Sequence, residues 1–229
     1  MIKRKTALKI RKTHRYLGLF IGIQFIMWTL GGLYFSWTDL DEIHGDHFKK
    51  EYQETAFSEL LNPIDLVPSV SSVEIKEIAG APYYWVNSEQ LFHARSGEKI
   101  QHISEEMAVA IANSRLKDEL KIDKVKLITK TGKHHEYRGG ELPAYVVSYK
   151  NPENLKAYIS ATNGSFKTVR HRDWRWFDFL WMAHTMDYEG RDDFNNWVLR
   201  IFSVLGLVTV LSGFVLWYVS SPTIRKINK

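Results

Sequence analysis

The hydrophobic and polar positions of this chain form two long uncharged runs, residues 17–37 and 201–221, separated by a segment of shorter patterns. At about 1.5 Å per helical residue, a run of this length spans a hydrocarbon core of about 30 Å. We therefore predict two transmembrane helices, over residues 17–38 and 197–220. The alternative is two buried core helices of a soluble protein.

The charges at the ends of these runs predict their orientation. Basic side chains precede the first run and follow the second: Lys3, Arg4, Lys5, Lys9, Arg11, Lys12, Arg15, Arg225, Lys226 and Lys229. Because basic flanks stay on the cytoplasmic side, we expect cytoplasmic tails at residues 1–16 and 221–229 and an outer domain at residues 39–172. The exit of the first run lacks a small-x-small cleavage pattern, which favours an uncleaved anchor.

The outer segment shows strand-like alternation at eight places. These are Val73–Ile78, Pro82–Asn87, Gln90–Ala94, Lys99–Ile103, Val125–Thr129, Ala144–Tyr149, Leu155–Ala161 and Ser165–Val169. A helix is predicted to begin after Ser104, a suitable N-cap that is followed by two glutamates. The fold class is therefore an α+β membrane protein in which two transmembrane helices flank an antiparallel-sheet-plus-helix domain.

A weak internal repeat runs through this outer segment. Pro82-x-Tyr84-x-Val86 resembles Pro143-x-Tyr145-x-Val147, and each is preceded by a strand pattern and followed by a strand and a glycine turn. The repeat suggests two related β-units in the outer domain.

Composition excludes several classes of function. The net charge of +5 comes largely from the two tails, so it indicates membrane topology and not nucleic-acid binding. The chain has no cysteine, which excludes disulfides, thiolate metal sites and c-type haem attachment. Motifs of serine hydrolases, zinc proteases and phosphate-binding loops are absent.

Two stretches near the outer ends of the helices carry candidate ligands. His44 and His47 lie three residues apart among carboxylates, a spacing that suits half of a metal site if the helix continues. The alternative is a polar helix end broken at Gly45. Residues 173–190 are predicted to form an interfacial amphipathic helix with one apolar stripe, made of Trp174, Phe177, Trp181, His184 and Tyr188.

The chain resembles the PepSY-associated transmembrane proteins. The resemblance rests on Thr13–Leu19 (THRYLGL) at the first span, Ser104–Ala108 (SEEMA), Pro143–Tyr149 (PAYVVSY), and Ser212–Tyr218 (SGFVLWY) in the second span. It implies a bacterial inner-membrane protein with a periplasmic PepSY domain, best matched at residues 104–169. Larger members resemble haem-containing, iron-linked reductases, whereas soluble PepSY domains are associated with protease inhibition; this chain has only two spans.

A haem b site is one interpretation of the first span. His14, Gly18 and Gly22 share one helical face, which pairs an imidazole with room for a ring. Close helix packing at the two glycines is the alternative. With His184 expected at the outer face, about 30 Å from His14, the two imidazoles cannot bind one iron. A haem at His14 would take its second ligand from a partner chain, and an outer site would combine His184 with His44 or His47.

The sequence thus favours a protein of redox or iron handling, either a small haem-binding electron carrier or a subunit of a larger membrane complex. The predicted partners are the lipid bilayer and a second copy or other subunits. The alternative is a membrane-anchored periplasmic module that binds a polypeptide, for protease inhibition or assembly, through the edge Tyr145–Tyr149. In either case we expect no hydrolase activity.

Overall fold

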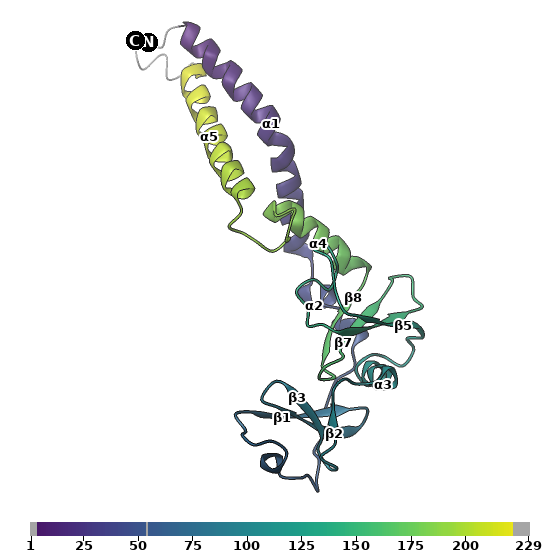
Figure 1. Cartoon of the computed structure of the whole chain (residues 1–229). Coiled ribbons are helices and arrows are strands. Elements are labelled where there is room, and N and C mark those ends of the chain that lie inside the picture. Colours follow the sequence, from purple (N-terminus) through teal and green to yellow (C-terminus); the bar gives the residue numbers. More distant parts are fainter. Residues whose placement is uncertain (1–3, 54, 222–229) are drawn as a thin grey trace. The chain divides into compact units, whose positions relative to one another are not determined.

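The computed structural model describes residues 4–53 and 55–221 (Figure 1). The chain divides into a helical unit, residues 1–38 and 177–229, and a sheet unit, residues 39–176. Of the predicted cytoplasmic tails, residues 1–3 and 222–229 lie outside the described residues.

The helical unit contains the two predicted long helices. They are α1 (Arg4–Trp37) and α5 (Trp197–Ser220), and both are long and apolar enough to cross a membrane. The bounds of α5 coincide with the predicted span 197–220, because Asn196 caps the helix by accepting a hydrogen bond from the Leu199 backbone N–H at 2.8 Å. Helix α1 begins before the uncharged run and includes most of the basic tail.

Helices α1 and α5 lie side by side and antiparallel (Figure 1). Phe20 of α1 stacks on Phe202 of α5 with ring centroids 6.2 Å apart. Nearer the C-terminal end of α1, Phe35 contacts two rings of helix α4 (Arg172–Thr185), those of Phe177 at 5.0 Å and Trp181 at 5.5 Å. The apolar stripe predicted for residues 173–190 thus packs in part on α1.

Helix α4 ends at Thr185, before the boundary at residue 190 that the sequence suggested, because Asp187 organises a tight loop. Its carboxylate accepts backbone N–H groups at 2.9–3.2 Å from Glu189, Gly190, Asp192 and Asp193. Burial would raise the pKa of Asp187, but these hydrogen bonds outweigh it and hold that pKa below its usual value. A Cβ at Gly190 would lie 3.0 Å from the Asp187 carboxylate, so a side chain there would fit only if the carboxylate moved slightly.

The sheet unit contains two four-stranded antiparallel sheets of the same order, β1-β2-β3-β4 and β5-β6-β7-β8. The first comprises β1 (Val73–Ile78), β2 (Ala81–Val86), β3 (Gln90–His93) and β4 (Lys99–Ile100), and the second β5 (Ile122–Ile128), β6 (Ala144–Tyr149), β7 (Lys156–Ser160) and β8 (Phe166–Arg170). Helix α3 (Glu105–Arg115) connects them, and the short helices are α2 (Leu40–Ile43), η1 (Asp46–Phe48) and η2 (Pro63–Asp65). All eight predicted strands are present, and the α+β class is confirmed.

One hydrophobic core joins both sheets and α3. Its fully buried members come from strands of each sheet and from the helix, among them Ile78, Leu91, Ala108, Val147, Ile159 and Val169. Ser104 caps α3 as predicted, with its Oγ accepting the Met107 backbone N–H at 3.2 Å. Burial of this shared apolar surface stabilises the two β-units as one body.

The predicted peptide-binding edge at Tyr145–Tyr149 is wrong. Strand β6 pairs with β5 on one side and β7 on the other, so its backbone groups are already used within the sheet. The alternation of apolar residues reveals a strand, but it does not reveal whether the strand is central or at an edge. Recognition of a polypeptide by strand addition at this position is therefore excluded.

Candidate functional site

His184 lies against the α1 backbone in the helical unit. Its Nδ1 is 3.2 Å from the Trp28 carbonyl oxygen, and its ring stacks on the Trp28 indole with centroids 4.7 Å apart and planes at 10°. The ring of Phe35 meets it edge-on at 5.4 Å. The imidazole lies over Gly31 and Gly32, where an added Cβ would meet it at ordinary contact distances of 3.4 and 3.6 Å.

The tautomer of His184 follows from its partner. A backbone carbonyl only accepts hydrogen bonds, so Nδ1 carries the proton and donates it to Trp28. The Nε2 atom then holds a lone pair, and no described residue makes a hydrogen bond to it. Imidazoles that bind metals are typically held in this way through the second nitrogen.

His14 has the same arrangement at the other end of the unit. Its Nδ1 lies 2.7 Å from Ser212 Oγ of α5. Ser212 donates its hydroxyl proton to the Thr209 carbonyl at 2.7 Å, so it accepts from His14 Nδ1–H. Gly213 provides the room, because a Cβ there would lie 3.3 Å from His14 Cε1. His14 Nε2 is therefore also unprotonated, and its lone pair is available to bind a metal.

Both histidines contact the middle of an uncharged run. Trp28 lies near the centre of residues 17–37, and Ser212 near the centre of residues 201–221. The sequence had placed His184 beyond Trp37, about 30 Å from His14. The fourteen residues from His14 to Trp28 correspond instead to about 21 Å of helix. This distance still prevents both imidazoles from binding one metal ion.

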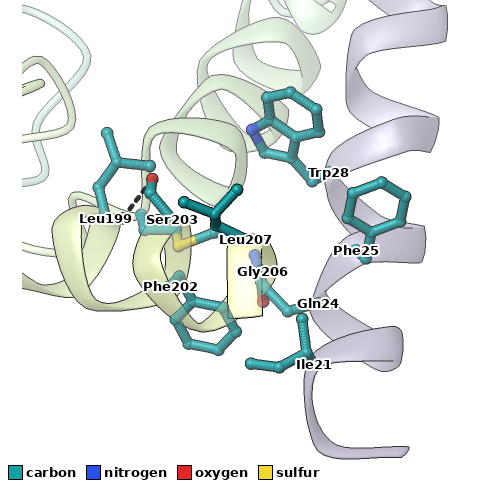
Figure 2. Close-up of a pocket in the computed structure, with 10 residues that line it drawn as sticks. Ile21, Gln24, Phe25, Trp28, Leu199, Phe202, Ser203, Gly206 and Leu207 are labelled. Carbon is teal, nitrogen blue, oxygen red and sulfur yellow. Dashed lines mark hydrogen bonds between the residues drawn. The ribbon is translucent and has the colours of Figure 1, made fainter. Parts of the chain in front are cut away.

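A pocket of about 350 Å³ lies between α1 and α5 (Figure 2). Its wall includes Gln24 and Trp28 from α1 and Phe202, Ser203 and Leu207 from α5. Neither histidine lines the pocket. Trp28 connects the pocket to His184, since its indole forms part of the pocket wall and also stacks on the imidazole.

The glycines predicted to accompany His14 do not pack against a neighbouring helix. A Cβ at Gly18 or Gly22 would find no atom within 4 Å. Within the described part of this chain no helix therefore packs closely on these two positions, and the surface beside them is open. The small residue that admits the His14 ring is Gly213.

The two histidines proposed as a metal half-site lie in the sheet unit. Gly45 separates the short helices α2 and η1, so His44 and His47 do not share a continuous helix. The structure brings His47 together with Glu153 and His171, a group that does not include His44. A site that combines His184 with His44 or His47 stays a prediction.

Sequence reasoning missed the residues that hold the imidazoles. Ser212 belongs to the SGFVLWY motif, but its pairing with His14 depends on the helix register. The available signal is a serine in one predicted span that can meet a histidine flanking the other span. Trp28 acts through its backbone carbonyl, for which no sequence signal exists.

Two apolar helices that each position an imidazole, together with a domain of two sheets, define a membrane protein with candidate ligand sites in its helical part. The model of the PepSY-associated TM region matches residues 11–226, and the chain belongs to this family. Comparisons with curated proteins and with solved structures found no match.

Proposed function

We propose that this protein binds haem b through His184 and His14 at two separate sites and acts in redox or iron handling, as a small electron carrier or a subunit of a larger complex. In this proposal the membrane is the bacterial inner membrane, both termini are cytoplasmic and the sheet unit is periplasmic. Residues 104–169, which form α3 and the second sheet, would be the PepSY domain.

The observation that carries the proposal is the shared state of the two imidazoles. Each donates Nδ1–H to a fixed oxygen, the carbonyl of Trp28 for His184 and the hydroxyl of Ser212 for His14. Each therefore offers Nε2 in a set orientation, as axial haem ligands do.

Aromatic rings and glycines adjoin the two imidazoles. His184 is flanked by the aromatic rings of Trp28 and Phe35, and the glycine surface beside His14 is open. Haem held by imidazole supplies one-electron transfer at a potential that its ligands and their hydrogen bonds set. The residues of this chain would orient the imidazoles through the hydrogen bonds to Trp28 and Ser212.

A second imidazole for a haem at either histidine would have to come from another chain. His14 and His184 are the two histidines of the helical unit, and about 21 Å of helix separates them. We therefore propose that His14 pairs with His14 of a second copy, in a homodimer or larger membrane complex.

A hemin titration of the detergent-solubilised protein tests the proposal. The wild type should develop a Soret band, and His14→Ala and His184→Ala should each lose only the haem of the site that the substitution removes. The double variant should bind none. His134→Ala, at an exposed position of the sheet unit, is the matched control and should bind as the wild type does. Equal binding by the wild type and the double variant would refute the proposal.

A further inference from the structure

Three potential metal ligands meet in the sheet unit, outside the helical sites. One ligand atom each of His47, Glu153 and His171 lies within 4.8 Å of the others. His47 lies in η1, Glu153 in the connection between β6 and β7, and His171 directly after β8. The His47 and His171 rings meet edge-on with centroids 5.4 Å apart. Residues far apart in the sequence thus converge on one point.

His171 is the strongest member of this group. Its side chain is completely buried, and Nε2 lies 3.1 Å from the Ile43 carbonyl oxygen, to which it must donate its proton. Its Nδ1 is buried and has no hydrogen-bond partner. A buried polar atom without a partner costs about 1–3 kcal/mol, so an occupant that binds it is expected. Nδ1 faces the Glu153 carboxylate, whose Oε2 is 3.4 Å away.

Glu153 is held by its backbone, which leaves its carboxylate available. Its carbonyl oxygen accepts the Arg172 backbone N–H at 2.8 Å and Arg175 Nη1 at 3.3 Å. The guanidinium of Arg175 is directed to another acid, with Nε 2.6 Å from Glu136 Oε2. The negative charge of Glu153 therefore remains next to His171.

Gly45 brings the third ligand to this point. It has φ +75°, a conformation that favours glycine, and a Cβ there would collide with Val169 Cγ2. The chain can therefore approach β8 closely between α2 and η1. Ile43 before this turn orients His171, and His47 after it contributes an exposed imidazole.

We propose that His47, Glu153 and His171 form a binding site for a divalent transition metal, with Zn²⁺ as the best-fitting ion. Two imidazoles and one carboxylate are a ligand set of zinc sites that keep a fourth position for water or substrate. Neutral imidazoles disfavour Mg²⁺ and Ca²⁺, which prefer oxygen ligands. The exposed side of His47 leaves the fourth position accessible.

Zinc titration of the full-length protein in detergent, purified without a polyhistidine tag, tests this site. The wild type should bind about one Zn²⁺ per chain in competition with a chromophoric chelator. His47→Ala and Glu153→Gln should weaken binding by more than about 100-fold, because even changes around the direct ligands cost about 10–100-fold. Both changes leave the buried His171 in place, so folding is expected to persist. Excess Mg²⁺ or Ca²⁺ should not displace the zinc.

His44→Ala is the matched control, since His44 is exposed, three residues from His47 and outside the group. It should bind zinc as the wild type does, and so should His14→Ala and His184→Ala, which separates this site from the haem proposal. Two results would overturn the assignment: equal zinc binding by the wild type and His47→Ala, as a simple His171–Glu153 ion pair predicts, or an equal loss in His44→Ala.

Discussion

The imidazole of His184 makes two contacts with Trp28, a hydrogen bond from Nδ1 to the backbone carbonyl and a stacking contact with the indole ring. The hydrogen bond involves the Trp28 backbone and the stacking contact its side chain. A substitution of Trp28 therefore removes the stacking contact but keeps the hydrogen-bond acceptor. The effect of the orientation of the imidazole can therefore be measured in a protein that still contains His184.

Trp28→Leu should leave the Nε2 donor in place and loosen its orientation. We expect haem to bind at the same stoichiometry with about 10-fold weaker affinity at the His184 site, the lower range for residues around a metal ligand. Trp37→Leu is the matched control, because Trp37 is exposed and has no ring contact among those found in the described chain. Complete loss of haem in Trp28→Leu, or no change in affinity, would contradict the role assigned to the stack.

Ser212→Ala should affect His14 through its hydrogen bond. Without the hydroxyl, Nδ1 has no fixed acceptor, so we expect about 10-fold weaker haem binding at this site and a changed reduction potential, measured by redox titration. Ser203→Ala is the control, since Ser203 donates to the Leu199 carbonyl of its own helix in a similar way but contacts no histidine. The same change in both variants would show that only helix packing was altered.

The two membrane histidines show how far sequence reasoning reaches. The uncharged runs predict the helices, and the position of His184 on an apolar stripe marks it as unusual. The sequence does not show that α4 packs beside α1 with His184 at Trp28, because helix register depends on the packing of many side chains. For the same reason the sequence overestimated the distance between His14 and His184.

Gly45→Ala tests the close approach of the α2–η1 turn to β8. An alanine at positive φ costs about 1–2 kcal/mol, and the collision with Val169 should add about 1–3 kcal/mol of overpacking. Gly80→Ala is the control with a comparable φ of +80° and no atom within 4 Å of the new Cβ. Thermal unfolding should show a clearly larger loss for Gly45→Ala. Equal losses would mean that the turn has room for a side chain.

Glu136 predicts an acid-sensitive contribution to the stability of the sheet unit. Burial would raise the pKa of this carboxyl, but hydrogen bonds from Arg175, Lys156 and Tyr158 outweigh it and lower the pKa to about 2. The stabilisation is therefore fully present above the ordinary value of 4.5 and is lost as the pH falls towards 2.

Glu136→Gln should lower the free energy of unfolding by about 2 kcal/mol at neutral pH, the scale of hydrogen bonds to a charged group. The difference from the wild type should shrink between pH 4.5 and 2, as followed by thermal unfolding. Glu119→Gln, at an exposed position, should change neither quantity. A pH-independent difference for Glu136→Gln would show that the ionised carboxylate is not the stabilising form.

The sheet unit was largely predictable, because alternation and turn residues are local signals. Ser104 marks the start of α3, and the strand patterns mark all eight strands. The zinc site was not predictable as a whole. His171 follows the buried Val169 of β8 by two residues. If the strand alternation continues, both side chains point to the same face, so the sequence could have indicated a buried histidine. Glu153 lies in a connection whose position depends on backbone hydrogen bonds to Arg172, and no local pattern reports them.

The proposed binding of haem b by the histidines of this membrane protein is tested most directly by the absorbance spectrum of the full-length protein purified from haem-replete cells. We expect a Soret band that shifts on dithionite reduction and disappears in the His14→Ala, His184→Ala double variant. A colourless protein that shows no spectral change with added hemin would contradict it.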